Sequence, residues 1–232
     1  MKLSIIVPCY NEENNISLIL NRFNNVIKDD EIEVILVNNG STDNSKDILN
    51  KLVPQFSFAK TVNVDTNLGY GFGIVSGLKE AKGEFISYTH ADMQTDPADV
   101  LKAYDLISRQ KNPENCYIKG DRKGRPLFDQ FFTIGMSWFE SLYLSAKLWD
   151  INAQPNVFHN SFFKQLSTIP KDFSLDLFFL YTAQKKNLNV VRFDVLFPER
   201  IHGESSWNNG LKDKYKFIKR TIEFSLKLKK EL

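Results

Sequence analysis

The 232-residue chain has few of the residues that mark specialised classes of protein. Its two cysteines, Cys9 and Cys116, are too few for a disulfide framework or a cysteine-based metal site. A formal net charge of +2 gives no reason to expect nucleic-acid binding. No run approaches the ~18 consecutive apolar residues of a membrane span, and the apolar run after Met1 is too short for a signal peptide. These absences favour a cytoplasmic globular protein.

Short apolar, β-branched runs alternate with segments of helical periodicity along most of the chain. The pattern predicts strands at 3–7, 33–37, 59–64, 84–88, 116–118 and 190–196, a strand and turn at 156–163, and helices between the early strands and at 97–111, 127–149, 174–187 and 211–230. Such alternation is typical of an α/β fold with a mostly parallel, doubly wound sheet. Pro8 should end the first strand, and Asn11 should cap the next helix. With no repeat or evident linker, residues 1–232 should form one domain.

A polar cluster follows the strand at 84–88 directly and is where we expect the chemistry. Ligands of parallel α/β sheets bind beyond the carboxyl ends of the strands. Asp92 and Gln94 are two residues apart, so an extended backbone places both side chains on one side. A carboxylate and an amide oxygen suit Mg²⁺ or Mn²⁺, with phosphate oxygens as further ligands. The alternative is a solvated loop in which Asp96 and Pro97 open the next helix.

Four strings in the first hundred residues share one resemblance. They are SIIVPCYNEENNI (4–16), VILVNNGSTDNS (34–45), NLGYGFGIVSGLKEAKGEFI (67–86) and HADMQTDP (90–97). As a set they resemble the family-2 inverting glycosyltransferases of GT-A fold, nearest to the dolichyl- and polyprenyl-phosphate sugar synthases. The resemblance covers residues 1–100 well and continues more weakly to about residue 207.

The resemblance implies a nucleotide-sugar site in residues 1–100. By position, Pro8, Tyr10 and Glu12 would contact the base and ribose. The family usually has two aspartates where Asn38 and Asn39 stand, so Asn39 leaves the identity of the base open, because an amide can both donate and accept. Asn67 and Gly69 would lie near the diphosphate, beside a positive helix N-terminus.

The resemblance also implies roles around the polar cluster. Asp92 and Gln94 match the second acid and the glutamine of the family's metal motif, and His90 replaces its first acid. His90 could bind the metal, hydrogen-bond a sugar, or mark an inactive homologue, and we expect the second role. Asp176 aligns with a helix-borne acid that would be a base for a hydroxyl acceptor. A phosphate acceptor is already anionic, and Asp176 would then be structural.

Arginines are expected to meet the phosphates. Arg122 and Arg125 stand where the family carries arginines that hold acceptor or donor phosphate, although a solvated basic loop at 119–126 is an alternative. Arg200, Gly203 and Ser205 match an Arg-x-x-Gly-x-Ser pattern that closes over the diphosphate in the family. Arginine suits such bidentate phosphate contacts.

The implied reaction is inverting, metal-dependent transfer of a sugar from a nucleotide-sugar to a polyprenyl phosphate. The alternatives are transfer to a saccharide hydroxyl in surface-polysaccharide assembly, and nucleotide-sugar binding without catalysis. Residues 1–100 would form the nucleotide-binding half, 101–210 the acceptor half, and 211–232 a basic C-terminal helix.

Two segments in the second half raise the question of a membrane. Residues 211–230 combine lysines such as Lys212, Lys219 and Lys227 with apolar residues at helical spacing, as in helices that lie in the interface of anionic membranes. We expect this segment to contact the inner face of a membrane peripherally. The aromatic-rich segment 127–149 is at least as well explained as a cover for hydrophobic surface of the domain or of a second subunit.

Overall fold

The computed structural model describes residues 1–125, 127–198, 200, 202 and 211–231, without the side chains at 127–129, 132, 211–217 and 231. The strands are β1 (Leu3–Cys9), β2 (Ile32–Asn39), β3 (Ala59–Val64), β4 (Phe85–Tyr88), β5 (Cys116–Lys123), β6 (Asn156–His159) and β7 (Asn189–Leu196). The helices are α1 (Ile16–Val26), α2 (Ser45–Leu52), α3 (Tyr70–Lys79), α4 (Pro97–Ser108), α5 (Leu127–Leu144), α6 (Asn160–Lys164), α7 (Leu175–Lys185) and α8 (Leu211–Glu231).

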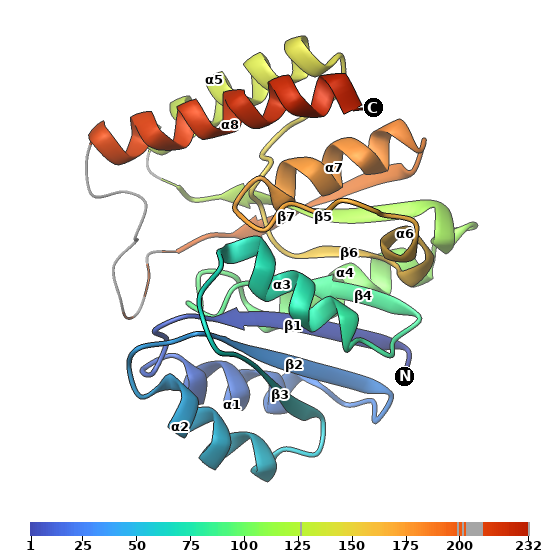
Figure 1. The fold of residues 1–232 in the computed structure, drawn as a ribbon. Helices are drawn as coiled ribbons and strands as arrows, with labels where there is room; N and C mark the ends of the chain where they lie inside the picture. The colour runs from blue at the N-terminus through green and yellow to red at the C-terminus, as the bar shows by residue number, and fades with distance from the viewer. Residues whose placement is uncertain (126, 199, 201, 203–210, 232) are drawn as a thin grey trace.

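The described strands form one sheet in the order β3-β2-β1-β4-β6-β5-β7 (Figure 1). β1 pairs in parallel with β2 and β4, β2 with β3, and β5 with β7. β6 is antiparallel to both of its neighbours, β4 and β5. The predicted α/β fold with a mostly parallel sheet is therefore confirmed, with β6 as the exception.

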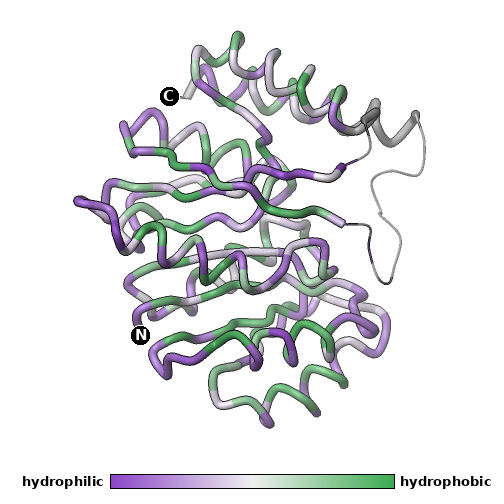
Figure 2. Tube along the Cα trace, turned by 180° about the vertical axis from the view of Figure 1, so that it is seen from behind, coloured by the Kyte–Doolittle hydropathy of each residue, from purple (hydrophilic) through white to green (hydrophobic). Residues whose placement is uncertain are grey.

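Helices cover both faces of the sheet because its central strands are apolar on both sides. Along β1, Ile5 and Val7 pack with α1, α2 and α4, whereas Ile6 packs with α3 and α7 on the other face. Strands buried on both faces read as continuous apolar runs, which is why their sequence signal is strong. Figure 2 shows hydrophobic positions concentrated along these strands and recurring at intervals along the helices.

Three local predictions were wrong. Pro8 lies within β1, opposite Val37, rather than ending it. Asn11 does not cap α1, which begins at Ile16; its backbone has a φ of 57°, and its side-chain oxygen accepts a hydrogen bond from the Thr42 backbone. The expected basic loop at 119–126 is largely strand, because β5 pairs with β7 as far as Lys123.

α5 and α8 lie side by side beyond α7, at the β7 end of the sheet (Figure 1). Ser225 of α8 donates a hydrogen bond of 2.5 Å to the buried carboxylate of Glu140 in α5. No helix in the described part of the chain is both long and apolar enough to cross a membrane.

Candidate active site

The parallel strands β1, β2 and β4 end at the same edge of the sheet, so the loops after them meet there. The loops after β1 and β2 are tied together by hydrogen bonds. The Asn11 backbone N–H donates to Ser41 Oγ at 3.1 Å, and the Glu12 N–H donates to Ser45 Oγ at 2.8 Å. These contacts fix the segment that carries Glu12 against the loop after β2.

Arg200 joins the two residues predicted to hold a metal. Its Nη2 lies 2.9 Å from Asp92 Oδ2, and its Nε donates to Gln94 Oε1 at 3.0 Å. Asp92 is 4% exposed, and its other oxygen accepts the Gln94 backbone N–H at 3.1 Å. The carboxylate and amide oxygens therefore converge on one cationic group, the guanidinium of Arg200.

Glu12 belongs to the same electrostatic group. Burial is the main reason that the pKa of Glu12 is raised to about 7, and the negative charge of Asp92 acts in the same direction. A hydrogen bond of 2.6 Å from the Asn15 side chain and the positive charge of Arg200 both oppose the rise. Glu12 thus changes charge near neutral pH next to the Asp92–Arg200 pair. Tyr10, at the end of the same strand, is 43% exposed, and Pro8 is half-buried.

His90 lies within electrostatic range of both parts of the site. Burial lowers the pKa of His90 against the opposing effects of Asp92 and Asp176, and the positive charges of Arg122 and Arg200 lower it further. The imidazole is therefore neutral near pH 7 and can donate and accept one hydrogen bond each. Its ring centroid is 5.7 Å from that of Tyr70, the first residue of α3.

The glycine-rich segment before α3 is shaped by two asparagines. Asn67 Oδ1 accepts the Gly69 N–H at 2.8 Å, and Asn39 Nδ2 donates to the Gly69 carbonyl at 3.0 Å. Gly69 has a φ of 116°, which disfavours any residue with a side chain. A Cβ on Gly73 would lie 2.8 Å from the Asn39 side chain, so glycine is also needed there. Asn39 is 3% exposed and packs against α3.

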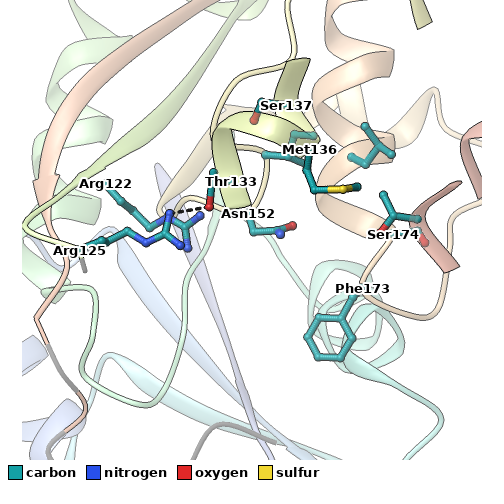
Figure 3. Close-up of a pocket in the computed structure, with 11 residues that line it drawn as sticks. Arg122, Arg125, Thr133, Met136, Ser137, Asn152, Phe173 and Ser174 are labelled. Atoms are coloured by element: carbon teal, nitrogen blue, oxygen red, sulfur yellow. Dashed lines mark hydrogen bonds between the residues drawn. The ribbon is translucent and has the colours of Figure 1, made fainter. Parts of the chain in front are cut away.

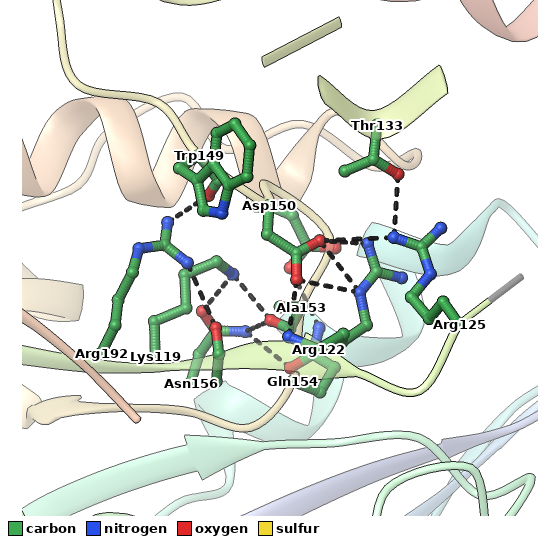
Figure 4. Close-up of polar contacts among 12 residues, drawn as sticks. Lys119, Arg122, Arg125, Thr133, Trp149, Asp150, Ala153, Gln154, Asn156 and Arg192 are labelled. Atoms are coloured by element: carbon green, nitrogen blue, oxygen red, sulfur yellow. Dashed lines mark hydrogen bonds and ion pairs between the residues drawn. The ribbon is translucent and has the colours of Figure 1, made fainter. Parts of the chain in front are cut away.

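Asp176 is buried in a polar network rather than lining an open site. It is 2% exposed, and its Oδ1 accepts hydrogen bonds from Tyr88 at 2.8 Å and from Gln154 at 3.1 Å. The buried Lys119 extends this network and donates to Ala153 and Asn156, both at 2.7 Å (Figure 4). Burial lowers the pKa of Lys119 to about 7, with Asp176 opposing that shift.

A cavity of about 140 Å³ lies under α5 and carries two arginines on one side (Figure 3). Arg122 pairs with Asp150 through its guanidinium and its backbone N–H, and Arg125 Nη1 donates to Thr133 at 2.9 Å (Figure 4). Burial raises the pKa of Asp150, but Arg122 outweighs that effect and the net shift is downward. The remaining lining is mixed, with Met136, Ser137, Ile151, Asn152, Phe173, Ser174, Leu177 and Thr221.

Sequence reasoning missed two of these residues. Asp150 follows α5 in a left-handed conformation with a φ of 37°, and Lys119 lies in a strand that the pattern predicts as loop. A lysine and an aspartate flanking an apolar segment carry no motif. Pairing of β5 with β6 and β7 brings Lys119 into the core, and hydrogen bonds from Arg122 hold Asp150 there. Ser205, predicted to contact phosphate, lies outside the described residues, and so does Gly203 of the same pattern.

Among known proteins, residues 4–164 match the sequence profile of glycosyl transferase family 2. The undecaprenyl-phosphate 4-deoxy-4-formamido-L-arabinose transferase of Proteus mirabilis is 27% identical over 129 residues, covering 51% of this chain and 40% of that protein. A dolichyl-phosphate beta-glucosyltransferase of Trichomonas vaginalis is 30% identical over 149 residues, covering 58% of this chain and 46% of that protein. The chain thus spans less than half the length of these relatives.

Solved structures share the fold at low sequence identity. Glucosyl-3-phosphoglycerate synthase of Mycobacterium tuberculosis, crystallised with Mn²⁺, UDP and glucosyl-3-phosphoglycerate, has a TM-score of 0.73 at 15% identity, over 98% of this chain and 79% of that one. A mannosyltransferase of Pyrobaculum calidifontis, crystallised with GDP-mannose and Mn²⁺, has a TM-score of 0.65 at 16% identity, over 89% of this chain and 59% of that one. Both confirm the predicted GT-A architecture.

Proposed function

This chain belongs to glycosyl transferase family 2, and from that premise we propose that it transfers a sugar from a nucleoside-diphosphate sugar to a polyprenyl phosphate, with inversion at the anomeric carbon. The observation that carries the proposal is the convergence of Asp92, Gln94 and Arg200 at the carboxyl edge of the sheet. Negative charge grows on the nucleoside diphosphate as it leaves the sugar, and a positive group nearby stabilises it. The guanidinium of Arg200 is such a group at the centre of this cluster. The relatives named for undecaprenyl-phosphate and dolichyl-phosphate transfer support the acceptor.

In this proposal Asp92 and Gln94 hold a divalent cation. The contacts with Arg200 support this fit. Its guanidinium is a cation that already lies against the Asp92 carboxylate and donates a hydrogen bond to the Gln94 amide oxygen. Mn²⁺ or Mg²⁺ takes such oxygen ligands, and structures of similar fold were crystallised with these ions and UDP. A bound ion would neutralise charge that grows on the leaving diphosphate. Among the described residues no group of three or more His, Cys, Asp or Glu could form a protein-only metal site, so phosphate and water would complete the shell.

Residues 1–100 hold the donor in this proposal, and residues 101–210 hold the acceptor. Tyr10, exposed at the end of β1, would stack on the base, and Glu12 would accept from a ribose hydroxyl. Pro8, Asn39, Asn67 and Gly69 would shape the nucleotide cleft, with Ser205 closing over the diphosphate. Arg200 would move from Asp92 onto the diphosphate when the ion and the donor bind.

The acceptor phosphate would enter the cavity that Arg122 and Arg125 line. Two guanidiniums beside one aspartate leave a net positive charge there, and Met136 and Leu177 supply apolar surface for the start of a lipid chain. A phosphate oxygen attacks without losing a proton, so the buried Asp176 has only a structural role. Since the lipid is held in a bilayer, the protein would work peripherally at the inner face of a membrane.

Transfer to a saccharide hydroxyl is the second candidate, and the state of His90 favours it. A neutral imidazole in range of Asp92 could take the proton from an attacking hydroxyl. Under the first candidate His90 would instead hydrogen-bond a sugar hydroxyl.

A screen of UDP- and GDP-sugars with Mn²⁺ would test the two candidates, with a polyprenyl phosphate and a saccharide acceptor supplied in parallel. We expect sugar to appear on the polyprenyl phosphate with inverted anomeric configuration. Product only on the saccharide would select the second candidate. Nucleotide-sugar binding without transfer or hydrolysis for any pair would leave a binding protein.

A further inference from the structure

The outer face of α5 is apolar and exposed at the positions whose side chains the structure describes. Among the α5 side chains that the structure describes, the exposed positions are all apolar or glycine: Phe131 at 72%, Ile134 at 41%, Trp138 at 70%, Phe139 at 36%, Leu142 at 68%, and Gly135. Phe131, Ile134, Trp138 and Leu142 recur at intervals of three and four, so they form one stripe along the helix. Isolated exposed apolar residues are ordinary, but a continuous stripe of large ones marks an interaction surface.

The opposite face of α5 packs against the rest of the protein and lines the cavity. Ser137, Glu140 and Leu144 are buried, and Thr133 and Met136 line the cavity beneath the helix. Glu140 accepts from Ser225, which fixes α8 against α5. The helix is therefore held in place, and its outward stripe cannot turn inward without breaking these contacts.

The neighbouring helix α8 carries positive charge on its exposed side. On α8, the exposed positions Lys219, Lys227 and Lys230 lie with Glu223 and Leu226 along one side of the helix. Lys229 donates to the Tyr143 carbonyl at 2.8 Å and lies 4.4 Å from the centre of the Tyr143 ring, which stacks on the exposed Phe139 of α5. The exposed Lys147 and the 44% exposed Trp149 follow α5.

We propose that the stripe on α5 inserts into the interfacial region of an anionic lipid bilayer, with the lysines of α8 against the headgroups. Tryptophan favours the boundary between headgroups and acyl chains, and helices of this kind enter it by their apolar face. Lysines near an anionic surface add attraction that salt screens. A second copy is a poorer occupant, because a symmetric contact would bring the same lysines together.

This inference reassigns the membrane contact that the sequence predicts for residues 211–230. Leu228 is 2% exposed and Phe224 packs against the core, so apolar residues of α8 are already used in the fold. Tyr215 and Lys212 have side chains outside the described part of the chain. α8 supplies the charge, and α5 supplies the apolar surface.

The surface also explains how the proposed acceptor site meets its substrate, and to that extent it rests on the proposed function. Thr133 and Met136 line the cavity from the inner side of the same helix whose outer side carries Ile134 and Trp138. A helix lying in the interface would therefore hold the arginine-lined cavity at headgroup depth. A lipid phosphate could enter without leaving the membrane.

Vesicle binding by the full chain tests the surface directly. Vesicles of phosphatidylcholine with and without phosphatidylglycerol would be sedimented with the wild type, with a Trp138→Glu/Leu142→Glu double variant, and with Leu18→Glu, a 37% exposed site on α1. We expect the wild type and Leu18→Glu to bind anionic vesicles equally at low salt. The double variant should bind the anionic vesicles at least about tenfold more weakly, because two large apolar side chains are no longer transferred from water into the bilayer. Bromine-labelled lipids should quench wild-type tryptophan emission, and less so in Trp138→Phe.

Transfer of sugar to a short-chain, water-soluble polyprenyl phosphate should be measured alongside. The two measurements then distinguish failure of the membrane surface from failure of the proposed function. Equal vesicle binding by the double variant and the wild type would overturn the surface. So would a wild type that ignores vesicles and forms dimers that the double variant loses, since a second copy would then cover the stripe. If vesicles bind as expected while no polyprenyl phosphate is glycosylated, the surface stands and the proposed function fails.

Discussion

Arg200 and Asp92 form an ion pair of 2.9 Å although they lie far apart in the chain, and the same guanidinium reaches Gln94. The chain thus supplies its own cation to the oxygens expected to hold a divalent ion. In the proposed site, Arg200 and the ion would compete for Asp92 when no donor is bound. When diphosphate is present, the arginine has another anion to bind, and the competition is relieved.

The first prediction follows from that competition. Arg200→Ala should bind Mn²⁺ more tightly than the wild type when no nucleotide is present, by roughly three- to tenfold, because a charge-assisted contact with Asp92 is removed. Titration followed by electron paramagnetic resonance of free Mn²⁺ measures this without any activity assay. Asp92→Asn should weaken binding in either background. Equal affinity in the wild type and Arg200→Ala would show that the arginine does not occupy the ion's position.

With donor present, the same substitution should act in the opposite direction. Arg200→Ala is expected to weaken nucleotide-sugar binding and to lower turnover, since a contact to the diphosphate is lost. Arg200→Lys should restore little, because an ammonium cannot make the bidentate contact. Calorimetry with a UDP- or GDP-sugar and Mn²⁺ tests this, and unchanged donor affinity in Arg200→Ala would contradict it.

Each candidate site residue has a local signal in the sequence, but the contacts between these residues have none. Asp92 and Gln94 follow an apolar strand in a polar run, and Arg200 lies in a motif, so each has a local signal. The contact of Arg200 with both depends on where the chain after β7 returns, which no local pattern encodes. For the same reason β5 was underestimated: Lys119 to Lys123 read as loop, and pairing with β7 overrides that weak propensity.

The role of Asp176, structural or general base, can be tested by substitution. Asp176→Asn keeps the oxygen that accepts from Tyr88 and Gln154, since both hydrogen bonds end on one atom. If phosphate is the acceptor, turnover should stay within about threefold of the wild type, because no base is needed. A loss of about a hundredfold or more, measured at saturating acceptor, would instead identify a general base.

The Arg122–Asp150 pair should stabilise the cavity wall. The two side chains are 10% and 5% exposed, so Asp150→Ala would leave a buried arginine without its carboxylate. We expect a loss of about 3–5 kcal/mol in the free energy of unfolding. In Arg122→Met/Asp150→Leu neither charge remains, and much of that loss should be recovered. Urea denaturation of the two variants compares them, and a double variant no more stable than Asp150→Ala would argue against the pair.

The last prediction concerns the stability of the α5–α8 contact as pH changes. Glu140 is fully buried, and burial raises its pKa to about 7 while the Ser225 hydroxyl opposes the shift. The folded protein therefore holds a proton on Glu140 that the unfolded chain releases near pH 4.5, the ordinary value of a glutamate. Between these two values the native state binds more protons, so this group's contribution to stability falls as pH rises.

Glu140→Gln removes that dependence while keeping an oxygen that can accept from Ser225. The variant should match the wild type at pH 5, within about 0.5 kcal/mol. At pH 8 it should be more stable by about 1–3 kcal/mol, since a buried carboxylate no longer has to ionise. Urea unfolding at the two pH values measures the difference, with Glu223→Gln, an exposed site on α8, as the control that should change little at either pH. If Glu140→Gln destabilises the protein equally at pH 5 and pH 8, the carboxylate is ionised in the fold and the burial argument fails.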